Sequence, residues 1–181
     1  MKTATQNLED DHVYILKLTD VMEQIARIKE PRADHISEIV DIVRNFADGM
    51  HHAKEENILF PKMAEKGFSP DQGPVAVMLH EHVDGRNFIR AVSDSLQLYI
   101  NGDTSVLPEI SQNILGYVFL LRNHIGKENN ILFKMADKVL SGSEQEKLLN
   151  DFDNAVKKYS SGKTPADYIG QIGVLASFYK V

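Results

Sequence analysis

The sequence predicts an all-α fold, arranged as an up-down-up-down four-helix bundle with a C-terminal helical extension. Four long segments repeat their apolar residues with the period of an α-helix, and no segment shows the sustained alternation that is typical of a strand. Short stretches rich in proline, glycine and serine separate these segments. Because short connections make consecutive helices antiparallel neighbours, four such helices favour a bundle.

The first two helices fill the first third of the chain. The first is expected from about Thr5 to Lys29, because Pro31 stops it. Asp34 offers an N-cap to the second helix, which is expected to reach about Glu65.

The third and fourth helices follow the clearest loop in the sequence, GFSPDQG at residues 67–73. The third helix begins directly after this loop and is expected to end near Asn101, before a glycine. The fourth begins at Thr104 or Ser105 and is expected to last to about Leu140.

The sequence Ser-Gly-Ser at residues 141–143 divides the chain into two parts. Residues 1–140 are expected to form the four-helix bundle, and residues 141–181 the C-terminal helical extension. The extension holds a shorter helix near 143–159 and an apolar tail that contains YIGQIGVLASFY. We expect it to pack on the bundle or on a partner subunit, and in the second case the tail would form a homodimer.

The composition excludes several classes of function. Hydrophobic residues make up 43% and charged residues 25% of the 181 residues, which is ordinary for a soluble globular domain. Without cysteine there is no disulfide, thiolate metal site or thiol nucleophile, so metal chemistry must use histidine and carboxylate. A net charge of −6 gives no basic surface for nucleic acid or an anionic membrane. The polar, acidic start does not resemble a secretory signal, so we expect a cytoplasmic protein.

An eleven-residue motif occurs twice. MHHAKEENILF spans residues 50–60 and NHIGKENNILF spans residues 123–133, with seven identical positions. Each copy places a histidine four residues before a glutamate, so the two side chains share one face of a helix. These pairs are His51 with Glu55 and His124 with Glu128.

Each of the four helices places a histidine in its apolar face. His12 follows Leu8 by four residues and precedes Ile15 by three, and His124 with Glu128 is expected to continue an apolar stripe to Ile131. The four inward histidines are His12, His51, His82 and His124.

The remaining histidines have less apolar surroundings. His35 starts the second helix and His80 lies beside Asp84, so both are expected at the surface. His52 is rotated by roughly a quarter turn from His51 and could still reach inward at a helix interface.

Three other residues near the motifs allow simpler interpretations. Tyr117 lies two turns before the second motif, where it could be a redox-active or hydrogen-bonding neighbour or an ordinary core residue. Lys54 and Lys127 occupy the same position of the two motifs and are expected on the solvated outer face.

A metal centre explains the inward polar cluster better than chance burial. One histidine on an apolar face is usually a satisfied core residue, but four imidazoles and two carboxylates buried without partners would each be costly. A multivalent cation neutralises the carboxylates and uses the imidazole lone pairs. The number of ligands suits two cations, and iron fits best, although the same ligands also accept manganese or zinc.

The motifs resemble those of the hemerythrin family, specifically the bacterial hemerythrin-like HHE cation-binding proteins. The resemblance covers about Leu8 to Asp137 and rests on four stretches: DH at 11–12, HHAKEENILFP at 51–61, EHVDGR at 81–86 and HIGKENNILF at 124–133. It implies a non-haem centre of two iron ions, oxo- or hydroxo-bridged, inside the bundle. The implied ligands are His12, His51, His82 and His124, with Glu55 and Glu128 as bridging carboxylates.

The sequence departs from the classical family pattern in two places. Classical hemerythrins supply two histidines from the third helix as His-x-x-x-His, whereas Met78 and Arg86 flank His82 at that spacing. In some hemerythrin-like proteins the residue directly after the second-helix histidine coordinates, so His52 is preferred to His80 as the fifth histidine ligand. The second bridge is His-x-x-x-Glu instead of His-x-x-x-x-Asp, so reversible oxygen carriage of the classical kind is not expected.

The resemblance implies a protein that binds, senses or responds to oxygen, nitric oxide or peroxide, or that handles iron. Its partner would then be a small diatomic ligand or peroxide. An alternative is a di-iron oxidase or ferroxidase of the ferritin-like class, but that class carries Glu-x-x-His where this chain carries His-x-x-x-Glu. The second alternative, a metal-free helical interaction module, disagrees with the inward cluster of ionisable residues. Whether the protein is an enzyme is left open by the sequence.

Overall fold

The computed structural model describes residues 2–159 and 161–181. Within these residues every regular element is a helix, and no strand occurs. The prediction of an all-α fold is therefore confirmed. No helix in the described part of the chain combines the length and the apolar character that crossing a membrane would need.

Four long helical columns come first along the chain. The first column is α1 (Ala4–Arg27), and the third is α4 (Gly73–Ile100). The second column runs without a break through α2 (Ala33–Ile42), η1 (Val43–His52), η2 (Glu55–Leu59) and α3 (Phe60–Glu65). The fourth runs through η3 (Thr104–Val106), α5 (Leu107–Lys127), η4 (Glu128–Leu132) and α6 (Phe133–Val139).

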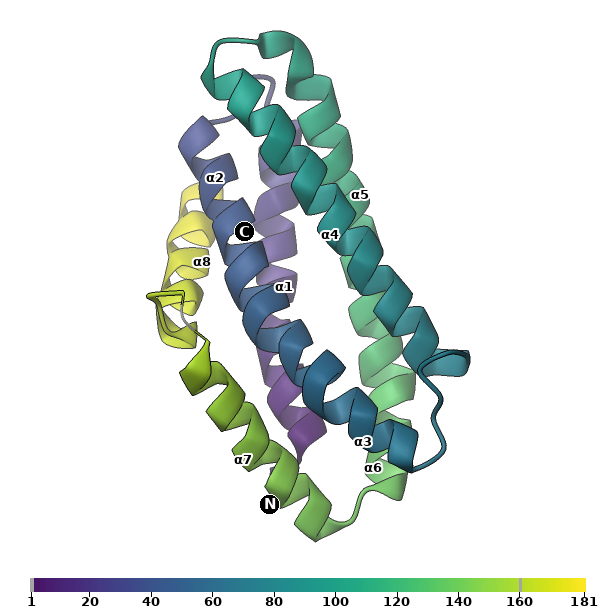
Figure 1. The fold of residues 1–181 in the computed structure, drawn as a ribbon. Helices are drawn as coiled ribbons and strands as arrows, with labels where there is room; N and C mark the ends of the chain where they lie inside the picture. Colours follow the sequence, from purple (N-terminus) through teal and green to yellow (C-terminus); the bar gives the residue numbers. More distant parts are fainter. Residues whose placement is uncertain (1, 160) are drawn as a thin grey trace.

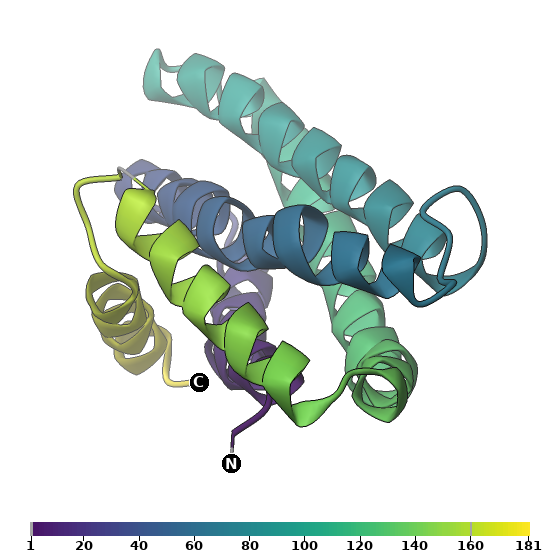
Figure 2. The same cartoon turned by 60° about the horizontal axis from the view of Figure 1, so that its bottom comes forward.

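Two shorter helices, α7 (Gly142–Lys158) and α8 (Pro165–Tyr179), complete the chain. Figure 1 shows the four long columns side by side, with α4 and α5 on one flank and α7 and α8 on the other. In Figure 2, α7 lies across the outside of α1 and the second column, and α8 lies along α1. The extension thus packs on the first two columns of the same chain.

The C-terminal helix also changes the surroundings of one histidine. His35, which was expected at the surface, is half-buried because the end of α8 covers it. Its Nδ1 atom lies 2.6 Å from the hydroxyl of Tyr179, and its ring meets Phe178 edge-on. Residues distant in sequence, which a helical pattern alone does not place, supply this cover.

Local sequence accounts for most helix starts. Thr3, Ser141 and Thr164 each form a capping box with the residue three positions later, and proline occupies the first turn of α4, α5 and α8. The expected N-cap at Asp34 is wrong, because the helix begins at Ala33. Asp34 lies in the first turn instead, where its carboxylate binds the guanidinium of Arg32.

The backbone widens to a π-helix in three places, where α-helix was expected. Two of these segments, η2 and η4, begin at Glu55 and Glu128, the equivalent glutamates of the two motifs. In a π-helix each amide bonds to the fifth residue before it, so more residues are needed for one turn and the buried face shifts along the sequence. The expectation that Ile131 continues the buried stripe is therefore wrong, because Ile131 is 53% exposed. The next residue, Leu132, is buried in its place.

The apolar core consists of two clusters that meet at one level of the bundle. The upper cluster includes Ile15, Met50, Ile89 and Leu121, and the lower one includes Leu8, Leu59, Met78 and Leu132. Each of the four columns passes from one cluster to the other, and at each crossing it carries one of the inward histidines. The buried histidine and glutamate side chains therefore lie in a single layer between the two apolar clusters.

Candidate metal centre

Seven buried side chains of this layer form two groups that share Glu55. The first, which we call the His52 group, consists of His52, Glu55, His82 and His124. The second, the His12 group, consists of His12, His51, Glu55 and Glu128. Within each group every residue offers one nitrogen or oxygen atom, and these atoms lie within 4.8 Å of one another. Either group could therefore hold a metal ion.

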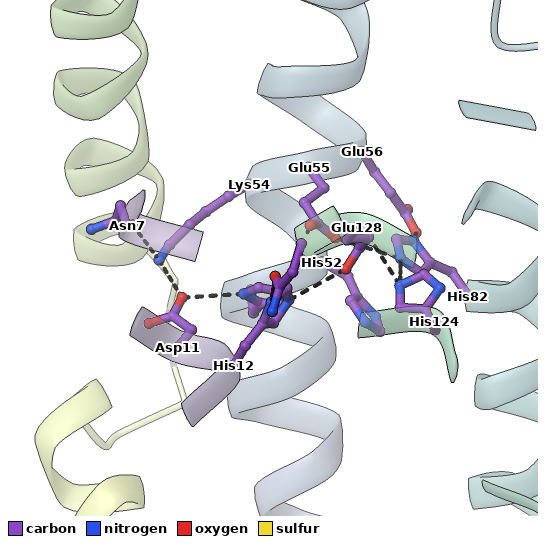
Figure 3. A network of polar contacts seen from close by, with 12 residues as sticks. Asn7, Asp11, His12, His52, Lys54, Glu55, Glu56, His82, His124 and Glu128 are labelled. Atoms are coloured by element: carbon purple, nitrogen blue, oxygen red, sulfur yellow. Dashed lines mark hydrogen bonds and ion pairs between the residues drawn. The ribbon is translucent and has the colours of Figure 1, made fainter. Parts of the chain in front are cut away.

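The structure brings together all seven residues named from the sequence and leaves His80 outside. The side chain of His80 is 77% exposed and lies 3.5 Å from Asp84. His51 and His52 are neighbours in sequence, yet both are buried, because they end the π-helical segment η1. Figure 3 shows His52 pointing toward His82 and His124, and the rings of His52 and His82 stack with centroids 3.9 Å apart.

Carboxylates outside the two groups fix the protonation of three histidines. The Nδ1 atom of His51 lies 3.2 Å from Asp11, that of His124 lies 2.9 Å from Glu81, and that of His82 lies 2.7 Å from Glu56. An ionised carboxylate only accepts hydrogen bonds, so each Nδ1 carries the proton and donates it. In a neutral imidazole the Nε2 atom then keeps its lone pair and directs it toward the centre of the layer.

The inward nitrogens face one another in pairs. Nε2 of His12 lies 3.0 Å from Nε2 of His51, and Nε2 of His82 lies 3.1 Å from Nε2 of His124. Two lone pairs at this distance repel, whereas a cation between them makes both nitrogens ligands. Two imidazole nitrogens bound to one ion at about 2.1 Å and at right angles would be separated by roughly 3.0 Å. The spacing of the nitrogens therefore suits a metal ion.

The two glutamates of the layer have no hydrogen-bond partner among the described residues, although both are fully buried. The oxygens of Glu128 lie 3.2 Å from His124 and 3.3 Å from His12, and those of Glu55 lie 3.7 Å from His51 and 3.5 Å from His82. These distances allow ion pairing, but the contacts lack hydrogen-bond geometry. Each carboxylate thus faces one histidine of each group, and a cation between the groups would stabilise these buried oxygens.

Burial controls the protonation of the centre. It lowers the pKa of His51 to about 4 and also lowers the pKa values of His52 and His82, so these imidazoles are neutral near pH 7. Burial, together with the charge of Glu128, raises the pKa of Glu55 well above its usual range. The protein groups alone therefore do not supply enough positive charge for two carboxylates.

In one ion pair of the layer, His124 with Glu128, the pKa values shift in the opposite directions to those of the three histidines just described and of Glu55. Burial acts to lower the pKa of His124, but Glu128 and Glu81 outweigh it and raise this pKa to about 9. Burial acts to raise the pKa of Glu128, but the imidazoles of His124 and His12 outweigh it, so this pKa lies well below the usual range.

The repeated motif builds two equivalent halves of the centre. In one half Lys54 binds Asp11 at 2.7 Å, and in the other Lys127 binds Glu81. Asp11 also contacts His51, which belongs to the same motif as Lys54. Glu81 likewise contacts His124, which belongs to the same motif as Lys127. The expectation that Lys54 lies on the solvated outer face is wrong, because it is only 6% exposed.

Sequence reasoning missed the acids that surround the ligands. Asp11 and Glu81 each directly precede an inward histidine, and this shared acid-histidine pair was the available signal. Glu56 and Asn129, which bind Nδ1 of His82 and of His12, stand at equivalent positions of the two motifs. Comparison of the two motifs could therefore have found Glu56 and Asn129, and comparison of the two acid-histidine pairs could have found Asp11 and Glu81.

Comparison with known families agrees with this geometry. The model of the hemerythrin HHE cation-binding domain matches residues 3–136. The chain belongs to the hemerythrin HHE family. The matched region of this hemerythrin-family protein contains the first three long columns, the fourth column as far as residue 136, and all seven residues of the two groups.

Several curated proteins are distantly similar to this hemerythrin-family chain. An uncharacterized protein of Mycobacterium tuberculosis is 22% identical over 84% of this chain and 60% of its own length. The iron-sulfur cluster repair protein YtfE of Edwardsiella ictaluri is 28% identical over 72% of this chain and 60% of its own length. YtfE of Pectobacterium carotovorum is 31% identical over 48% of this chain and 40% of its own length.

The chain therefore spans at most about 60% of the length of these curated relatives. No solved structure is similar enough to this chain to count as a match.

Proposed function

We propose that this protein holds two iron ions without haem and that it binds, senses or responds to oxygen, nitric oxide or peroxide, or handles iron. The observation that carries the proposal is the convergence of imidazole lone pairs and two unpartnered carboxylates in one buried layer. Distant relatives with the name of iron-sulfur cluster repair proteins favour a role connected with iron.

The two groups would each hold one ion. His52, His82 and His124 would bind one iron, and His12 and His51 the other. Glu55 and Glu128 would lie between the ions, because each directs one oxygen toward the His52 group and the other toward the His12 group. Imidazole with bridging carboxylate suits iron best, although the same atoms also accept manganese or zinc.

Iron would supply a reversible change of oxidation state and an open position for a small ligand. Burial keeps the imidazoles of His51, His52 and His82 neutral. The outer carboxylates orient the rings of His51, His82 and His124. The two apolar clusters pack above and below the layer. Residues 1–140 would form the up-down-up-down bundle that holds the centre, and a homodimer through residues 141–181 stays a prediction.

The number of carboxylates separates this proposal from a ferroxidase. The two groups contain five histidines and only two glutamates, whereas ferritin-like sites use four glutamates with two histidines. Such a centre would retain a fixed, small number of ions and would not pass many ferrous ions inward.

Metal analysis of the purified protein tests the proposal. We expect about two irons per chain and a visible absorption band that changes when the reduced protein meets oxygen or nitric oxide. Excess ferrous iron added in air should leave this ratio unchanged. Continued uptake of iron, or sustained oxygen consumption, would assign the protein to the ferroxidase class instead. A chain that binds no metal at all would refute the proposal.

A further inference from the structure

The two equivalent halves of the centre differ on one side. One half of the centre contains His52 and, next to the His52 group, Asp48, Glu56 and Arg86. The equivalent positions in the other half are Ile125, Leu121, Asn129 and Leu16. Three ionisable side chains and a histidine in one half thus correspond to apolar or uncharged residues in the other. A symmetric metal centre does not need this difference, so it suggests a second task on the side of His52.

A pocket of about 220 Å³ lies on this side and reaches the His52 group. Arg44 and Arg90 are exposed at its outer part, and His52 and His82 are buried at its inner part. Since one water molecule takes roughly 30 Å³ of liquid, the pocket has room for roughly seven. It is therefore much larger than a diatomic ligand requires.

The charges of the pocket favour an anion. Arg44 and Arg90 form no ion pair with any residue in the described part of the chain, although the chain as a whole carries a net charge of −6. Arg86, by contrast, is neutralised, because it lies 2.7 Å from Asp48 and 2.6 Å from Glu56. Two guanidinium groups are thus left without a carboxylate at the mouth of one pocket.

A buried hydroxyl in the wall points to the same class of ligand. Tyr117 is almost fully buried and lines the pocket, and its hydroxyl has no hydrogen-bond partner among the described residues. Burial, with a smaller effect of the Asp48 charge, raises the pKa of Tyr117, so the phenol keeps its proton. Its hydroxyl is therefore a hydrogen-bond donor. An unpaired buried donor is costly, and a ligand oxygen would satisfy it.

We propose that this pocket binds a small oxyanion next to the His52 group. Arg44 and Arg90 attract the negative head group, since guanidinium pairs with planar oxyanions through two hydrogen bonds. Tyr117 donates a hydrogen bond to a ligand oxygen. Val43 and Ile89 form an apolar wall of the same pocket, which favours a short carboxylate over an inorganic oxyanion.

Calorimetric titration of the purified, metal-containing protein at low ionic strength tests the site. Propionate, nitrate and the uncharged propionamide serve as probes. We expect saturable binding of both anions, tighter binding of propionate, and none of propionamide. If nitrate binds as tightly as propionate, the pocket still takes an oxyanion, and its natural source is inorganic.

Three variants distinguish the pocket from direct binding to a metal. Arg44→Gln with Arg90→Gln should weaken propionate binding roughly ten- to a hundredfold, since two charge-assisted hydrogen bonds are lost. Tyr117→Phe should weaken it roughly fivefold for the loss of one donor. Arg27→Gln changes the net charge at an exposed site outside the pocket and should have little effect.

Absence of saturable anion binding by the unaltered protein would overturn the inference. Equal binding by the double arginine variant would also overturn it, because the anion would then sit elsewhere or on a metal. Metal content measured on the same samples reports separately on the proposed function, so either hypothesis can fail alone.

Discussion

Replacing Asp11 with asparagine should weaken metal binding at the His12 group without touching a ligand. Asp11 accepts a hydrogen bond from Nδ1 of His51 at 3.2 Å and another from Lys54 at 2.7 Å. Burial acts to raise the pKa of Asp11, but the contacts with His51 and Lys54 lower it to about 2, so it is ionised near pH 7. Its charge both fixes the tautomer of His51 and makes the imidazole a better electron donor.

The expected magnitude follows from these contacts. Loss of such an outer partner lowers metal affinity roughly 10- to 100-fold, which is about 1.4 to 2.7 kcal/mol. The buried ammonium group of Lys54 would lose the carboxylate of Asp11 and would have only uncharged amide oxygens as partners, among them that of Asn7 at 3.0 Å. Because Asp11 is partly exposed, we expect a loss of stability of about 1 to 3 kcal/mol, less than for a fully buried pair.

Competition with a chelator measures the affinity, and urea unfolding measures the stability. Asp10→Asn is the matched control, since Asp10 is the preceding residue, is 64% exposed and pairs only with Lys2 among the described residues. The control should retain the metal affinity of the unaltered protein. If Asp11→Asn competes with the chelator as well as Asp10→Asn does, then the outer carboxylate does not orient His51 as we argue.

Three further predictions concern the inward histidine of α4, the removal of the metal and the packing of one glycine. His82→Ala should lose at least one metal ion per chain while His80→Ala retains both, and the reverse result in metal analysis would refute the assignment of the inward face. Removing all metal with a chelator should lower the thermal midpoint by roughly 5 to 15 °C; an unchanged midpoint would mean that the buried carboxylates are satisfied without a cation. Gly116→Ala should destabilise by about 1 to 3 kcal/mol, because its Cβ would lie 2.6 Å from the ring of Phe88. Gly126→Ala, with open space around its Cβ, should be neutral or stabilising in urea unfolding, and equal stability losses in both variants would exclude the steric explanation.

The sequence allowed prediction of the inward histidines because burial follows the helical period. His12, His51, His82 and His124 stand in apolar stripes, and an ionisable residue in such a stripe must lie in the core. The same period failed after Glu128, since a π-turn depends on a shift of backbone hydrogen bonds that apolar spacing does not encode.

The outer partners were harder to predict because they join residues of different helices. Lys54 looked like a surface residue on its own helix. The packing of α1 against the second column brings Asp11 to its ammonium group, and Phe152 of α7 also covers it. A single sequence gives the face of each helix but not its rotation against a neighbour. Contacts between columns therefore needed the structure, although the repeated lysine was visible in both motifs.

The internal repeat separates two tasks that would otherwise be confounded. Residues shared by both halves, namely the acid-histidine pairs and the His-x-x-Lys-Glu motifs, account for the inward nitrogens, the two bridging carboxylates and the acids that orient them. Asp48 and Arg86, which are found in one half only, line the pocket and lie outside the two groups. Arg44 and Arg90 line the pocket but belong to neither metal-binding group. Their substitution should therefore alter anion binding while the metal content stays the same. A centre whose metal content fell with these arginines would show that the two halves cannot be divided in this way.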